Sequence, residues 1–182
     1  MSTATSPYSS KGRVVARTVS AALAKDRRKL RVFFQTRATV KGPYAPLWSA
    51  DVAQRIDWVK EGIPSAVLVV MASDMQVPRE KLLFWSRISR ATATRKLQAG
   101  AALSADEGER ALGLARLIGQ VTHVVQESGN PEGFDAATWT ADWLEQPNPA
   151  LGGKAPGQYM DTADGRELVS SLIARMQSGA YA

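Results

Sequence analysis

The stretch SADEGERALGLARLIGQVTHVV, residues 104–125, decides how this chain folds. It opens with Ser104 and Glu107 at capping-box spacing, in which the serine hydroxyl accepts from the Glu107 amide and the glutamate accepts from the serine amide. The apolar residues that follow recur every three or four positions, which is the period of one helix face: Leu114, Leu117, Ile118, Val121, Val124 and Val125. Gly129-Asn130-Pro131 ends the pattern, so the sequence predicts a long amphipathic helix between these signals.

Similar helix-start and helix-stop residues bound further segments on both sides of this helix. Ser49 is expected to cap a helix that ends at Gly62, and Pro64 and Pro78 suit the first turns of two more. Ser89 and Asp135 are predicted caps of helices that end near Gly100 and Gln146, and a last helix is expected after residue 162. No convincing strand follows residue 45, so the predicted fold class is all-α.

The 182 residues carry a formal net charge of +6, and this charge is unevenly distributed. Residues 1–41 hold ten lysines and arginines against Asp26 alone, whereas residues 97–182 hold five against eleven acidic residues. Such asymmetry favours a polyanion partner at one end and a different partner at the other. The alternative interpretation is that the charges only solvate helix faces.

The chain divides into three predicted parts. Residues 1–45 form a basic N-terminal arm and linker, largely irregular, with a possible basic helix over 13–31 and a linker over 31–49. This arm also fits an organellar transit peptide, a contact with DNA or a proteolysis-prone tag. Residues 46–102 are expected to form a helix-turn-helix domain, and residues 103–182 a second helical domain.

The composition excludes several kinds of chemistry. There is no cysteine, which rules out disulfides and thiolate metal sites, and His123 is the only histidine, so no two-histidine metal site can form. We expect no metal, no cofactor and no enzymatic activity. The most apolar stretch, residues 62–73, falls short of the roughly 18 residues that a membrane span needs, so a location in the cytoplasm is expected.

Residues 77–98, VPREKLLFWSRISRATATRKLQ, resemble two short helices separated by a turn, as in a helix-turn-helix. A second helix that begins with a capping serine and continues with arginine and threonine can direct hydroxyls and guanidinium groups at phosphates and base edges. The expected outward-facing DNA-binding residues are Arg87, Ser89, Arg90, Thr92, Thr94, Arg95 and Lys96. A solvated helix pair is the alternative, and Arg87 and Leu83 depart from the glycine and small residue usual in this motif.

The C-terminal third contains Trp143-Leu144 followed by PNPALGG at residues 147–153, then Asp161-Thr162 and a terminal Gly179-Ala180-Tyr181. These residues closely resemble the toxin-binding domain of Xre/MbcA/ParS-type antitoxins, the partners of RES-domain toxins. The resemblance extends upstream through Ser104 and the helix pair, over about residues 60–182. It implies that residues 103–182 form the dimerisation and toxin-binding domain, and a second toxin contact then becomes a further alternative for the basic arm.

This resemblance implies a dimeric type II antitoxin of bacteria that blocks the active-site pocket of a RES toxin and represses its own operon. Such toxins consume NAD or act as ADP-ribosyltransferases. The toxin-binding residues that the resemblance implies are Trp143, Asn148, Pro149, Leu151, Gly152, Gly153, Lys154, Tyr181 and Ala182. The residues themselves leave alternatives open: Pro-Asn-Pro can simply break a helix, Trp143 can belong to the core, and the chain can be a DNA-binding regulator whose C-terminal domain only dimerises.

Overall fold

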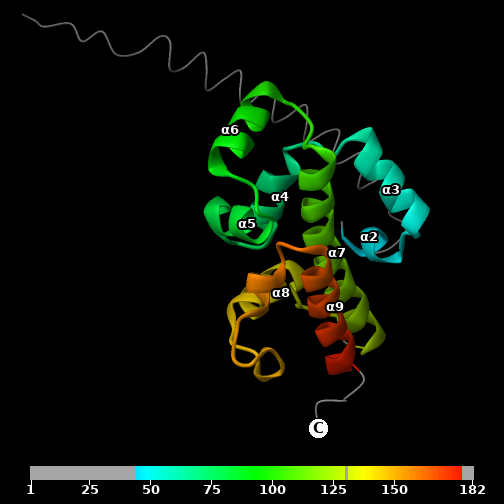
Figure 1. The fold of residues 1–182 in the computed structure, drawn as a ribbon. Helices are drawn as coiled ribbons and strands as arrows, with labels where there is room; N and C mark the ends of the chain where they lie inside the picture. Colours follow the sequence, from blue (N-terminus) through cyan, green and yellow to red (C-terminus); the bar gives the residue numbers. More distant parts are fainter. Residues whose placement is uncertain (1–43, 130, 178–182) are drawn as a thin grey trace, which may run out of the picture.

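One long helix runs through the centre of the molecule (Figure 1). The computed structural model describes residues 44–129 and 131–177, and this helix is α7 (Ala105–Glu127). The Ser104 hydroxyl accepts from the Glu107 amide at 3.3 Å, and the Ser104 amide donates to the Glu107 carboxylate at 2.8 Å. The predicted capping box is therefore confirmed.

A group of three helices lies beside the N-terminal half of α7: α4 (Val67–Asp74), α5 (Arg79–Trp85) and α6 (Arg90–Ala99) (Figure 1). The Ser89 hydroxyl caps α6 by accepting from the Thr92 amide at 3.1 Å. Gly100 closes the same helix in the left-handed conformation with φ +60°, which glycine adopts without a Cβ clash. Both ends of α6 therefore lie where the sequence predicts them.

The C-terminal elements pack against the other half of α7: α8 (Ala136–Glu145), the 3₁₀ turns η1 (Pro149–Leu151) and η2 (Pro156–Tyr159), and α9 (Ala163–Gln177). The Asp135 carboxylate caps α8 by accepting from the amides of Ala137 and Thr138. Gln120 of α7 and Ser170 of α9 exchange two hydrogen bonds of 2.9 and 2.7 Å, which hold these helices together where Gln120 is buried.

The buried side chains form one hydrophobic cluster that spans the two predicted helical domains. Leu68 and Trp85 come from the first, Leu114 and Ile118 from α7, and Leu172 from α9; each is at most 1% exposed. The boundary at residue 103 stays a prediction, because α7 supplies core residues to both sides of it. Apart from the single bridge Pro64–Ala102, residues 44–129 and 131–177 contain no β-structure, which confirms the all-α fold.

Two local predictions were wrong. Asp51, not Ser49, caps α3 (Val52–Glu61), because its carboxylate accepts from the Gln54 amide at 2.7 Å. Part of the expected linker is the short helix α2 (Ala45–Ser49), which packs on α7 and buries Leu47. The predicted basic helix over 13–31 lies outside the described residues. Within the described ranges, no helix combines the length and apolar composition needed to cross a membrane.

Candidate functional site

The α5–turn–α6 unit has the packing that a helix-turn-helix needs. Leu82 and Trp85 of α5, Ile88 of the turn and Ala93 of α6 are all buried, so the two helices share one apolar interface. Arg87 occupies the turn with φ +48°, a left-handed conformation that is uncommon for residues other than glycine. The turn therefore keeps the backbone of the motif despite the missing glycine.

The side chains of α6 differ in how far they reach solvent. The Arg90 side chain is 74% exposed, and its guanidinium lies 3.8 Å from the Glu80 carboxylate on α5. Arg95 is exposed one turn further along the helix, while Thr92 and Thr94 are half-buried. Ser89 is also exposed, but its hydroxyl is bonded to the Thr92 amide and hydroxyl. The two arginines are thus the long cations that α6 presents to solvent.

Lys96 does not project outward as the sequence analysis expects. Its ammonium lies 2.8 Å from the Glu107 carboxylate of α7 and donates to the Ala102 carbonyl, and only 17% of its side chain is exposed. Burial by itself raises the pKa of Glu107, but hydrogen bonds from Lys96 and from Ser104 lower it below its usual range overall. Lys96 therefore ties α6 to the start of α7.

Arg87 and Asp161 join the helix-turn-helix to the C-terminal segment. The Arg87 guanidinium donates to the Asp161 carboxylate at 2.8 Å, although 69% of the Arg87 side chain remains exposed. Both residues line a hollow of about 500 Å³, which also contains Phe84 and Gln158. Phe84 is 65% exposed and Asp161 lies 74 residues from Arg87. Sequence reasoning did not name either as a site residue: Phe84 is the off-phase apolar residue of its helix, and Asp161 entered only as part of the family resemblance.

The segment that follows α8 forms a closed loop around Asn148. The Asn148 side chain accepts from the Ala150 amide at 2.9 Å, and its backbone amide donates to the Lys154 carbonyl at 3.1 Å. Gly152 and Gly153 have φ angles of +64° and +81°, and a Cβ placed on either would meet nothing within 4 Å. These glycines are needed for the backbone turn, and they leave the tip of the loop exposed together with Pro149 and Lys154.

Two of the expected toxin-binding side chains lie inside the protein instead. Trp143 is 8% exposed and stacks on Trp139 with ring centroids 5.9 Å apart and planes 9° apart, while Leu151 is 9% exposed. Both side chains pack in the core next to the loop, and their assignment to toxin binding stays a prediction. Tyr181 and Ala182 lie outside the described residues.

The described ranges contain no cluster of three or more histidine, cysteine, aspartate or glutamate residues that could hold a metal ion. His123 lies on the exposed side of α7, with its Nε2 atom 3.3 Å from the Glu127 carboxylate. His123 and Glu127 are therefore a residue pair one turn apart on the surface of a single helix.

Comparison with known proteins shows which families the two halves of the described chain resemble. Residues 54–116 match the family described as the antitoxin Xre-like helix-turn-helix domain, and residues 132–179 match the antitoxin Xre/MbcA/ParS C-terminal toxin-binding domain. A protein described as "Prs ADP-ribosylating antitoxin" from Sphingobium sp. (strain YBL2) is 37% identical over 148 residues. That similarity covers 81% of this chain and 93% of the relative.

Proposed function

The chain belongs to the Xre/MbcA/ParS family of antitoxins, and from this membership we propose that it binds and neutralises a cognate RES-domain toxin. The name of its Sphingobium relative refers to ADP-ribosylation, which supports a toxin that consumes NAD or transfers ADP-ribose. The proposed inhibition is steric: the antitoxin covers the pocket in which the toxin binds its substrate.

The observation that carries this proposal is the closed loop over residues 148–154. Its ends are held by the hydrogen bond from the Asn148 amide to the Lys154 carbonyl, and its base is held by the buried Leu151. Its tip is exposed backbone and one cation, Lys154. A loop that is already ordered loses little conformational entropy on binding, so it is well suited to enter a cleft in a partner.

A second part of the proposal is repression of the operon by the helix-turn-helix. Arg90 and Arg95 lie exposed on α6, which suits contacts with phosphates and base edges, while Arg87 and Ser89 lie at the turn. Thr92 and Thr94 are half-buried, so only part of each side chain can contact DNA, and Lys96 forms an ion pair with Glu107. We expect a homodimer to present two such helices to a palindromic operator. Because the operator DNA lies in the bacterial cytoplasm, we expect the protein there too.

The loop is tested by co-expressing the chain with the toxin gene beside it and measuring co-purification and growth. Lys154→Glu reverses an exposed charge and Asn148→Ala removes the side chain that orders the loop. We expect both to weaken toxin binding by about tenfold or more while a helical, folded protein remains. Arg95→Ala is the matched control, since it removes an exposed charge from the other surface and should leave growth protection intact.

Two results would contradict the proposal. If both loop variants protect as well as the unchanged chain, the toxin is bound elsewhere. If the unchanged chain binds operator DNA but neither binds nor neutralises the toxin, the protein is a regulator whose C-terminal domain serves only dimerisation. A truncation after Gln146 is less informative, because it also removes the buried Val169, Leu172 and Ile173 of α9 from the core.

A further inference from the structure

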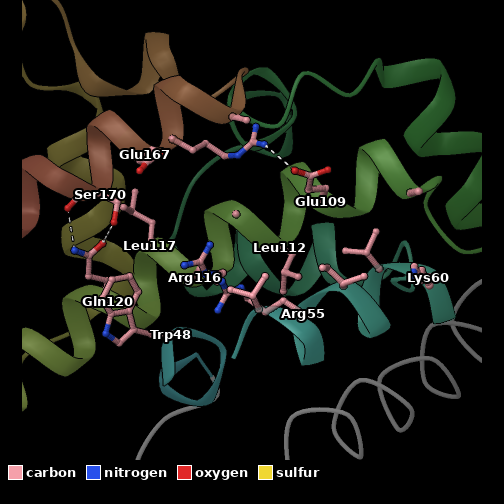
Figure 2. A pocket seen from close by; sticks show the side chains of 17 residues that line it. Trp48, Arg55, Lys60, Glu109, Leu112, Arg116, Leu117, Gln120, Glu167 and Ser170 are labelled. Atoms are coloured by element: carbon pink, nitrogen blue, oxygen red, sulfur yellow. Dashed lines mark hydrogen bonds and ion pairs between the residues drawn. The ribbon is translucent and has the colours of Figure 1, made fainter. Parts of the chain in front are cut away.

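A third surface lies on the side of α7 away from α6 (Figure 1). It is a groove of about 730 Å³ between α3, α7 and the start of α9. Figure 2 shows its lining side chains, of which the ones used below are Trp48, Val52, Arg55, Ile56, Arg116 and Arg166. Neither the α6 face nor the 148–154 loop contributes to it, so the proposed function leaves this groove unexplained.

One wall of the groove is apolar and open to solvent. The apolar period of α3 predicts that Val52 and Ile56 face the core, but they are 62% and 46% exposed and line the groove instead. Trp58 is the residue of α3 that is buried. Large aliphatic side chains exposed together beside a groove are typical of an interaction surface.

The floor of the groove carries a guanidinium that forms no ion pair with any carboxylate in the described part of the chain. Among the described residues, Arg116 has no carboxylate within ion-pair distance and its Nε atom is buried without a hydrogen-bond partner. Its guanidinium lies over the Trp48 ring, 5.9 Å from the centroid, and the Arg55 side chain lies beside it (Figure 2). Burial lowers the pKa of Arg116, and the charges of Arg55 and Arg166 lower it further.

The acidic side chains near the groove act mainly on Arg166. Glu109 lies 3.7 Å from it, the charges of Asp106 and Asp161 also favour its charged form, and Glu167 lines the groove, whereas no described carboxylate forms an ion pair with Arg55 or Arg116. A partly buried cation among like charges is costly, and an incoming carboxylate that pairs with it in bidentate fashion relieves that cost. The groove therefore favours an acidic occupant that also has aliphatic side chains for Val52 and Ile56.

The N-terminal arm of the chain does not fit this description. Residues 1–41 carry ten basic residues against one acidic residue, so the arginines of the groove would repel it. Nucleic acid would meet the guanidinium groups but would leave the aliphatic wall unused. We propose that this groove binds an acidic amphipathic segment of a partner protein, with a carboxylate on Arg116 and aliphatic side chains against Val52 and Ile56.

The probe for this proposal is a displayed library of random 16-residue peptides, selected on the immobilised full-length protein. We expect recovered peptides to combine Asp or Glu with Leu, Ile or Phe at helical spacing. Fluorescence anisotropy of these peptides should show affinity reduced about tenfold or more by Arg116→Gln and by Ile56→Ser. Phe84→Ser and Arg90→Gln, which change a more exposed aromatic residue and a more exposed cation elsewhere, should leave the affinity unchanged.

Other outcomes overturn the proposal. Recovery of no peptide, or of peptides that bind both groove variants as well as the unchanged protein, means that the groove is not a peptide site. Sedimentation of the protein alone provides another test: if Ile56→Ser dissociates a dimer, a second copy of the chain occupies the groove. Displacement of the recovered peptides by single-stranded DNA but not by free glutamate-rich competitor peptide would assign the groove to nucleic acid. Ile56 is exposed, so its variant is expected to fold even if Arg116→Gln does not.

Discussion

The Arg87 guanidinium lies 2.8 Å from the Asp161 carboxylate and thereby connects the turn of the helix-turn-helix to the short segment between η2 and α9. The same two residues line the hollow that contains Ser89 and Arg90, at the start of α6. The proposed DNA surface and the toxin-binding domain thus adjoin one another at this ion pair.

Asp161→Asn should strengthen operator binding. The substitution removes the negative charge beside Arg87 and frees that guanidinium for a phosphate, but the pair is exposed, so the gain is at most about fivefold. Anisotropy titrations of operator DNA at several salt concentrations measure it, and the salt dependence should steepen by about one phosphate contact. Unchanged affinity and salt slope would show that Arg87 does not reach the DNA.

Two neighbouring substitutions on α6, Arg95→Ala and Lys96→Ala, should affect different properties. Arg95 is exposed, so its loss should weaken operator binding with little change in stability. Lys96 is paired with Glu107 and mostly covered, so its loss should reduce the free energy of unfolding by about 1–3 kcal/mol. Urea unfolding and DNA titration of both variants separate the two roles. If both variants lose DNA affinity equally and have the same free energy of unfolding, the assignment of DNA binding to Arg95 and of stability to Lys96 is wrong.

Glu107 should make the stability of the fold fall in acid. Its pKa is lower in the folded chain than the ordinary value of about 4.3. The stabilisation is therefore present above that value and is lost as the pH falls through the lower folded pKa. Urea unfolding between pH 3 and pH 7 should show a smaller decline for Glu107→Gln. An identical decline in both proteins would mean that other carboxylates control acid unfolding.

Gly157→Ala should destabilise the contact between the two halves of the core. A Cβ at this position would lie 2.5 Å from the Trp85 indole nitrogen and 2.8 Å from the Leu144 carbonyl oxygen, so neighbouring atoms must move. We expect a loss of about 1–3 kcal/mol. Gly133→Ala is the comparison, because its Cβ would meet nothing within 4 Å and its cost comes only from the backbone strain of its φ of +74°, which Gly157 does not share. Thermal unfolding should show the larger loss at Gly157; the reverse order would contradict the close packing of η2 on α5.

Much of the candidate site was predictable because its signals are local. The resemblance over PNPALGG located the loop, and the structure then separated exposed Pro149 and Lys154 from buried Trp143 and Leu151. The groove around Arg116 was not predictable, since it needs residues from α2, α3, α7 and α9 at once.

The sequence by itself determined where α6, α7 and α8 begin. Ser89, Ser104 and Asp135 cap their helices through amides only two or three residues away, so their effect does not depend on the rest of the fold. The tertiary structure decided which way the side chains face. In the folded chain Lys96 pairs with Glu107, Arg87 pairs with Asp161, and Ile56 is exposed. These placements depend on the tertiary structure because the partners of each side chain come from segments that only folding brings together.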